Sequence, residues 1–154
     1  MISIADVAIT RLSESCCTEY ELRLYLQKEF QAQPNVDHHI EFAMQKLKDS
    51  ELVNDLRLAT NLAQRYANKG NRLISQMLRQ KGISEEVIER VLSSLDNENV
   101  RALSEAQKKL NGQWDRSEKA MTGLHRFLSG RSFSYHVIDS VLGQLSEQRA
   151  CAIN

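Results

Sequence analysis

A repeat of 50 residues is the strongest constraint on the fold of this chain of 154 residues. Ten residues between positions 74 and 95 have counterparts of the same kind 50 positions later. The pairs are Ile74/Leu124, Leu78/Leu128, Lys81/Arg131, Ile83/Phe133, Ser84/Ser134, Val87/Val137, Ile88/Ile138, Val91/Val141, Leu92/Leu142 and Leu95/Leu145. Because one offset preserves apolar, capping and basic residues together, it indicates two copies of one structural unit.

Each unit is predicted to contain three short helices. Apolar residues recur at intervals of three and four along residues 58–66, 73–78 and 87–95, and no sustained alternation of period two appears. Gly70 and Gly82 follow the first two stripes, where a glycine in the left-handed conformation would end a helix, and Ser84 suits the start of the third. We therefore expect an all-α protein.

A weaker copy precedes these two. Leu22 and Leu26 match Ile74 and Leu78 at an offset of 52, and Ile40, Met44 and Leu47 match Ile88, Leu92 and Leu95 at an offset of 48. The difference falls in the polar loop around Pro34, and Thr18 with Glu21 forms a predicted capping box ahead of Leu22. We expect three tandem three-helix repeats, at residues 1–53, 54–95 and 96–154. Since one repeat is too small to bury a core alone, they should stack as a short, elongated solenoid.

The charges balance overall but not locally. The chain has 20 Lys and Arg against 20 Asp and Glu. Residues 1–53 carry 5 basic against 9 acidic residues (−4), residues 54–95 carry 7 against 4 (+3), and residues 96–154 carry 8 against 7 (+1). Between Asp55 and Glu85 no acidic residue interrupts six basic ones. Any electrostatic attraction to a partner should therefore come from the middle repeat.

Nothing in the sequence indicates a membrane span or a signal peptide. No apolar run reaches the roughly 18 residues that a spanning helix needs, and the first residues lack a basic start and an apolar stretch. A cytoplasmic location is expected. We predict that the three cysteines, Cys16, Cys17 and Cys151, are reduced thiols, because a bond between the adjacent pair would be strained.

Three segments of the middle repeat resemble the RecX family of regulatory proteins. They are residues 52–59 (LVNDLRLA), 65–74 (RYANKGNRLI) and 78–83 (LRQKGI), and the resemblance is sharp from about residue 52 to residue 95. The third repeat has Arg131-Ser132-Phe133 where the family has an Arg-Gly-Phe turn. The resemblance implies a regulator that binds the RecA nucleoprotein filament in its helical groove. It implies inhibition of recombinase activity, through blocked filament growth or disassembly, and thereby a role in DNA repair, recombination and the SOS response.

The basic residues of the middle repeat are the candidate partner-binding residues. They are Arg57, Arg65, Arg72, Arg79 and Lys81, with Lys69 and Arg131 as weaker candidates. An ordinary solvated helix face would look similar, and Lys69 and Lys81 stand where a lysine can simply interact with a helix dipole. Arginine, by contrast, suits bidentate contact with carboxylate or phosphate. A monomeric protein that binds the filament, with at most a weak DNA contact, is the leading hypothesis.

Two other functional classes have less support in the sequence. A helical DNA-binding module acting without RecA is the alternative, since short helices joined by glycine turns can mimic a helix-turn-helix. An enzyme is not expected, because the sequence has no phosphate-binding glycine loop and no nucleophile motif. The pairs Cys16-Cys17 and His38-His39 lack metal-ligand spacing, so neither a metal nor a cofactor is predicted.

The aromatic residues, scattered at core spacing, are predicted to pack inside rather than to stack on bases.

Overall fold

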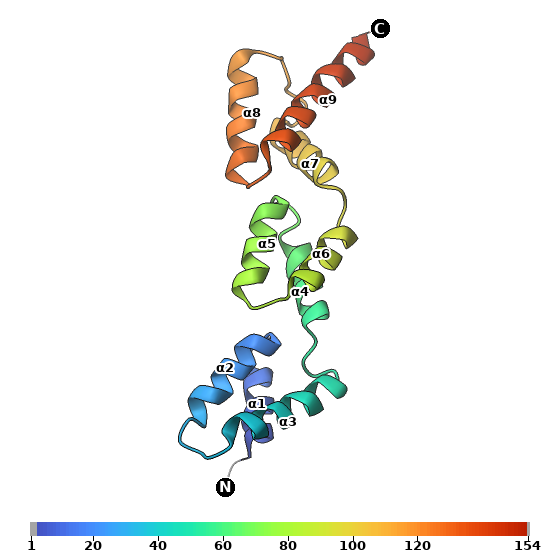
Figure 1. Cartoon of the computed structure of the whole chain (residues 1–154). Coiled ribbons are helices and arrows are strands. Elements are labelled where there is room, and N and C mark those ends of the chain that lie inside the picture. Colours follow the sequence, from blue (N-terminus) through green and yellow to red (C-terminus); the bar gives the residue numbers. More distant parts are fainter. Residues whose placement is uncertain (1–2, 154) are drawn as a thin grey trace. The chain divides into compact units, whose positions relative to one another are not determined.

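The structure, a computed structural model, describes the backbone of residues 3–153 and the side chains of residues 3–147. This part of the chain is entirely helical, without a strand (Figure 1). The helices are α1 (Ile4–Glu14), α2 (Glu19–Glu29), α3 (Val36–Asp49), α4 (Asp55–Arg65), α5 (Asn71–Gln80), α6 (Glu85–Ser94), α7 (Glu98–Leu110), α8 (Glu118–Gly130) and α9 (Tyr135–Ile153). The prediction of an all-α protein built from three-helix repeats is confirmed.

The helices form two compact units. The first contains residues up to Leu62 together with Leu78–Glu89, and the second contains Ala63–Met77 together with residues from Arg90 onward. The first unit has a core cluster that consists of Ala8, Cys17, Leu22, Leu26, Ile40, Met44, Leu47 and Val53. The core of the second consists of Ala102, Ala106, Trp114, Leu124, Leu128, Phe133, Val137, Ile138, Val141 and Leu145. The helices of the middle repeat thus supply residues to both units.

The predicted helix starts are present. Thr18 and Glu21 form the capping box, in which each backbone N–H donates to the other residue's side chain at 3.1 Å. Ser84 and Ser134 accept the N–H groups of Val87 and Val137 at 3.3 and 3.4 Å. Each cap satisfies a backbone donor that the first helical turn leaves without a partner.

The two glycines of the middle repeat have different roles. Gly82 is in the left-handed region at φ 81°, as predicted, and Ser132 takes the same conformation at φ 67° in the third repeat. The prediction for Gly70 was wrong, since α4 already ends at Arg65 and Gly70 is not left-handed. Gly70 is needed for close approach instead, because a Cβ there would clash with the backbone of Ser132.

Neighbouring repeats meet twice through a hydrogen bond to an equivalent backbone carbonyl. The Thr18 hydroxyl donates to the carbonyl of Lys81 at 2.6 Å, and the Gly70 N–H donates to the carbonyl of Arg131 at 2.8 Å. Lys81 and Arg131 are equivalent residues of the second and third repeats. In both cases the start of a repeat's second helix therefore holds the turn that ends the second helix of the next repeat. We call these contacts the first and second repeat junctions.

An acidic side chain completes each junction. The Asp55 carboxylate accepts the N–H of Glu19 at 2.9 Å, and the Glu98 carboxylate accepts that of Asn71 at 3.4 Å. Asp55 and Glu98 are the first residues of α4 and α7, and Glu19 and Asn71 are the first residues of α2 and α5. A carboxylate placed at a helix N-terminus is favoured by the helix dipole.

The first junction contains a carboxyl group that is costly to ionise. Burial, as the largest cause, raises the pKa of Asp55, against the opposing effect of its hydrogen bond with the Glu19 N–H. The pKa of the Glu19 carboxyl is lowered instead, because Arg23 and Lys48 bind it and outweigh its own partial burial. Asp55 thus loses part of its stabilising effect when it ionises in the folded state.

We predict that Leu78→Ala lowers the free energy of unfolding by about 2–5 kcal/mol, since the side chain is 0% exposed and its removal leaves a cavity. Urea denaturation measures the change. The control Leu24→Ala removes a side chain that is 48% exposed and should cost less than about 1 kcal/mol. Equal costs for the two variants would contradict the assignment of Leu78 to the core.

Asp55→Asn tests the cost of the buried charge. A carboxyl whose pKa is raised by folding stabilises fully below its ordinary pKa of about 4, and this stabilisation is lost as the pH rises through the raised value. Asparagine keeps an oxygen acceptor and does not ionise. The stability of Asp55→Asn relative to the parent should therefore increase from about pH 4 to pH 7. Denaturation at both pH values, with the exposed Asp139→Asn as control, measures this, and a decrease would show that the charge stabilises the junction.

Candidate partner-binding surface

The candidate basic residues belong to α4, α5 and the turns that follow α4, α5 and α8. Arg57 and Arg65 are on α4, Arg72 and Arg79 on α5, and Lys69, Lys81 and Arg131 in the turns. In the first unit the structure places Arg57, Arg79 and Lys81, and in the second Arg65, Lys69, Arg72 and Arg131. Their assignment to partner binding stays a prediction.

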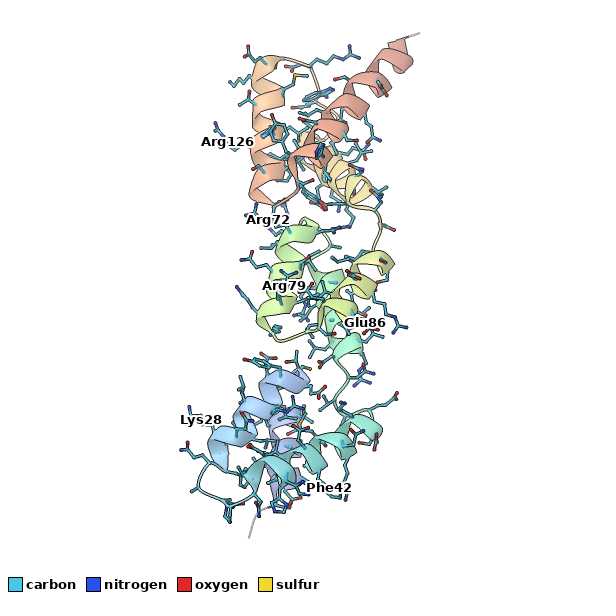
Figure 2. The ribbon with its side chains drawn as sticks, in the orientation of Figure 1. Lys28, Phe42, Arg72, Arg79, Glu86 and Arg126 are labelled. Atoms are coloured by element: carbon cyan, nitrogen blue, oxygen red, sulfur yellow. The ribbon has the colours of Figure 1, made fainter. Side chains whose placement is uncertain are left out.

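Arg72 and Arg79 are the best placed of these residues to meet a partner. They are seven residues apart on one helix, which is about two turns, so both side chains are on the same side of α5. Both are exposed, and Figure 2 labels them along this helix. The opposite side of α5 is buried through Ile74 and Leu78, each 0% exposed. The helix is therefore fixed by its apolar side while its arginines face solvent.

Three of the candidates form ion pairs in the folded protein, each with an acidic residue that lies outside the basic stretch of the sequence. Arg79 forms a two-point ion pair with Glu85, with one N–O distance of 3.1 Å. The Lys81 ammonium is 3.6 Å from a Glu21 carboxylate oxygen, and the Arg131 guanidinium is 3.9 Å from Glu105. The absence of acids between Asp55 and Glu85 in the sequence therefore does not carry over to the folded protein.

These ion pairs differ in how readily the basic residue could leave its acidic neighbour and bind a partner instead. The side chains of Arg79 and Glu85 are 56% and 63% exposed, so their pair contributes little to stability and its arginine stays accessible. The hydrogen bond between them raises the pKa of Arg79 and lowers that of Glu85. Arg131 is less available, because its guanidinium also lies over the Phe127 ring, 4.7 Å from the centroid.

Among the described residues, neither Arg65 nor Arg72 makes a side-chain hydrogen bond or an ion pair. Arg57 donates through its guanidinium to the carbonyl of Glu51 at 3.0 Å. At Lys69 the backbone carbonyl, rather than the ammonium group, accepts a hydrogen bond from Arg101. Arg72 thus combines exposure with a guanidinium that has no acceptor in the described part of the protein.

Arg101 was not predicted from the sequence, although it is the most buried charged residue of the structure's described part. Its side chain is 7% exposed, and its guanidinium donates to the carbonyls of Asp96, Ala67 and Lys69 at 2.8, 3.0 and 2.6 Å. A further hydrogen bond reaches the Asn71 side chain. Arg101 therefore ties the turn after α4 to the start of α7 at the second junction.

A signal for Arg101 existed in the sequence. The first residues of α4 and α7 are equivalent, so Arg101 stands where the second repeat has Leu58, within an apolar stripe. A charged residue in such a stripe needs buried acceptors. Burial, the largest cause, lowers the pKa of Arg101, and the nearby Glu98 and Asp96 oppose that shift. The backbone carbonyls accept the hydrogen bonds that a carboxylate would otherwise accept from this guanidinium.

The prediction that the aromatic residues pack inside is confirmed for only some of them. Trp114 and Phe133 are buried, but Phe42, Tyr135 and Tyr20 are 62%, 68% and 48% exposed. Phe42 lies under the Lys46 ammonium at 4.6 Å, and Tyr135 meets His125 edge to face at 5.3 Å. The prediction is wrong for these three residues, because apolar periodicity alone does not distinguish the exposed positions of a helix from the buried ones.

Other features of the described residues concern metals, thiols and membranes. No group of three or more His, Cys, Asp or Glu side chains within them is arranged to hold a metal ion. Cys16 is exposed, Cys17 is buried, and both are free thiols, while the side chain of Cys151 lies outside the described residues. None of the described helices is both long and apolar enough to cross a membrane.

Comparison with known proteins identifies the family. The family model described as RecX, second three-helix domain, matches residues 54–92. The chain is 30% identical over 141 residues to the regulatory protein RecX of Vibrio vulnificus (strain CMCP6), covering 90% of each protein. The chain belongs to the RecX family. It is also 31% identical to regulatory protein RecX of Clostridium botulinum (strain Eklund 17B / Type B), over 92% of this chain and 68% of that protein.

Solved RecX structures share the fold. The crystal structure of RecX from Lactobacillus salivarius superposes with a TM-score of 0.75 at 23% identity, covering 93% of this chain and 94% of that one. A second crystal structure, of regulatory protein RecX, gives a TM-score of 0.66. The relatives are named as regulatory proteins.

Arg101→Met tests the second junction. Methionine retains much of the aliphatic length but none of the donors, so the carbonyls of Ala67 and Lys69 lose a partner. We expect the free energy of unfolding to fall by about 2–4 kcal/mol in a denaturation experiment. Arg90→Met, at an exposed position of α6, is the control and should change it by less than about 0.5 kcal/mol. An Arg101→Met protein as stable as the parent would contradict the role assigned to this guanidinium.

Proposed function

We propose that this RecX-family protein binds the RecA nucleoprotein filament and inhibits recombinase activity, thereby modulating DNA repair and recombination. Support comes from the relatives named regulatory protein RecX and from the match of the middle repeat to the family's second domain. The same repeat carries the excess of positive charge. A location in the cytoplasm, where such filaments form, and a monomeric state belong to this proposal.

The exposed pair Arg72 and Arg79 on α5 is the observation that carries the proposal. A RecA filament on DNA offers two kinds of anion, carboxylates of the protein and phosphates of the DNA. Guanidinium groups bind either through two parallel hydrogen bonds. Because α5 is anchored by buried apolar residues, both arginines are presented from a rigid element, and the entropic cost of binding is reduced.

The proposed mode of action is stoichiometric binding rather than catalysis. Arg57, Arg65, Lys69, Lys81 and Arg131 extend the candidate surface beyond α5. Of these, Arg57 and Arg65 are the more exposed, whereas Arg131 is held by Phe127 and Glu105. We rank Arg72 and Arg79 first, Arg57 and Arg65 second, and the three turn residues last.

The alternative is a helical module that binds DNA without RecA. This alternative predicts an affinity for bare DNA that decreases steeply as the salt concentration is raised. The slope of log affinity against log salt would give the number of phosphates contacted. The overall neutrality of the chain disfavours tight binding of this kind, since 20 basic residues are balanced by 20 acidic ones. A salt-dependent affinity for DNA alone, equal to that for the filament, would favour the alternative.

The double variant Arg72→Glu/Arg79→Glu tests the proposed surface. We expect it to weaken inhibition of RecA-catalysed ATP turnover on single-stranded DNA by at least about tenfold in the concentration required, because two attractive contacts become repulsive. Helix content by circular dichroism should be unchanged, since both side chains are exposed.

The matched control is Lys28→Glu/Arg90→Glu, which makes the same change of charge at exposed positions of α2 and α6. This variant should inhibit like the parent. Equal inhibition by both double variants would remove the α5 arginines from the surface. A parent protein that does not affect RecA filaments at stoichiometric amounts would refute the proposed function itself.

A further inference from the structure

The third repeat has an apolar groove on the face equivalent to the candidate face of the second repeat. The groove runs between α8 and α9, has a volume of about 650 Å³, and is lined by Met121, His125, Arg126, Gly130, Leu142 and two small polar residues. Tyr135 adjoins it through its edge-to-face contact with His125. We call this site the α8–α9 groove.

The repeat allows a position-by-position comparison of the two faces. At the offset of 50, Met121 and Tyr135 replace Asn71 and Glu85. In the same way, Thr122 and Ser129 replace Arg72 and Arg79. The polar and charged groups of the second repeat are thus exchanged for apolar or neutral ones, although the positions remain at the surface.

The apolar side chains at the α8–α9 groove are exposed to solvent. Tyr135 is 68% exposed and Met121 36% exposed, and Leu142 is partly accessible beside them. Clustered apolar side chains at the surface of a protein mark an interaction site, because their exposure to water is unfavourable unless a partner covers them. Methionine and tyrosine are also residue types that interfaces favour.

The charge around the groove indicates the chemistry of its occupant. Arg126 is the one charged residue among those lining the groove, and Figure 2 labels it on α8. Its guanidinium is exposed, and it also borders an adjoining hollow that contains Lys119 and Glu118. An apolar side chain with a carboxylate close by would therefore be complementary to the groove.

We propose that the α8–α9 groove docks an apolar side chain of the RecA protein that stands beside an acidic residue, so that Arg126 binds the carboxylate. This inference rests on the proposed function and adds a second contact of different chemistry. The second repeat binds through charge, and the third repeat binds through burial of apolar surface. A protein segment fits better than nucleic acid, because one arginine in the lining offers few contacts to phosphates.

The test is the variant Met121→Glu/Tyr135→Glu, assayed by co-sedimentation with RecA filaments on single-stranded DNA. Both side chains are at the surface, so the fold should be retained, which thermal denaturation checks. We expect at least about a tenfold loss of affinity. The loss should persist when salt is raised, whereas the effect of Arg72→Glu/Arg79→Glu should shrink.

Two further variants sharpen the result. Gly130→Leu places a side chain in open space within the groove, where a Cβ meets no atom within 4 Å, and should reduce affinity by filling the site. Phe42→Glu/Leu24→Glu is the matched control, because it places acids at two exposed apolar positions of the first unit. The control should bind like the parent.

The outcomes separate the two proposals. Parental affinity of both groove variants, together with reduced affinity of the charge-reversed α5 variant, would overturn the groove and leave the proposed function in place. Failure of the parent to sediment with RecA filaments would overturn both. If the groove variants lost affinity equally for a bare thymidine oligonucleotide, the occupant would be nucleic acid, and the proposal of a protein segment would be wrong.

Discussion

The contact between the start of one helix and the turn that ends another determines how the repeats of this protein are joined. The first N–H groups of a helix lack partners within it, and the last carbonyls of a helix lack donors. At the second junction the Gly70 N–H donates directly to the Arg131 carbonyl, and at the first the Thr18 hydroxyl takes the place of the N–H and donates to the Lys81 carbonyl. The candidate residues Lys81 and Arg131 are therefore fixed through their backbones, independently of what their side chains bind.

The two junctions use the same geometry with different chemistry. The first relies on a hydroxyl and on Asp55, whose ionisation is disfavoured by burial. The second relies on a glycine N–H and on the buried guanidinium of Arg101, which binds three carbonyls. The guanidinium group of arginine stays protonated at any ordinary pH, so the charge of Arg101, unlike that of Asp55, does not depend on acidity.

Much of the fold could be predicted from the sequence, because its features are local. The apolar stripes, the Thr18 capping box and the serines that begin α6 and α9 depend on spacings of three or four residues. The repeat offset also located Ser132 as the counterpart of Gly82, and both adopt the left-handed conformation. What failed was the role of Gly70, since nothing near it in the sequence reveals that Ser132 lies against it.

The candidate surface was harder to predict for the same reason. Its residues follow from a stretch without acids, but Glu21 and Glu105 reach Lys81 and Arg131 from other helices. Arg101 and the α8–α9 groove were missed because their meaning comes from comparing repeats. Arg101 differs from Leu58, and Tyr135 differs from Glu85. In a repeat protein, such departures at equivalent positions are informative, since the shared fold explains only what is common.

The glycines at the two junctions have a consequence for the order of the repeats. At the first junction the downstream repeat supplies the glycine, since a Cβ at Gly82 would collide with Tyr20. At the second the upstream repeat supplies it, since a Cβ at Gly70 would collide with Ser132. A shortened chain that joined the first repeat directly to the third would bring Tyr20 against Ser132, with no glycine on either side. The modules are therefore not interchangeable, and loss of the middle repeat would create a steric conflict rather than simply a shorter protein.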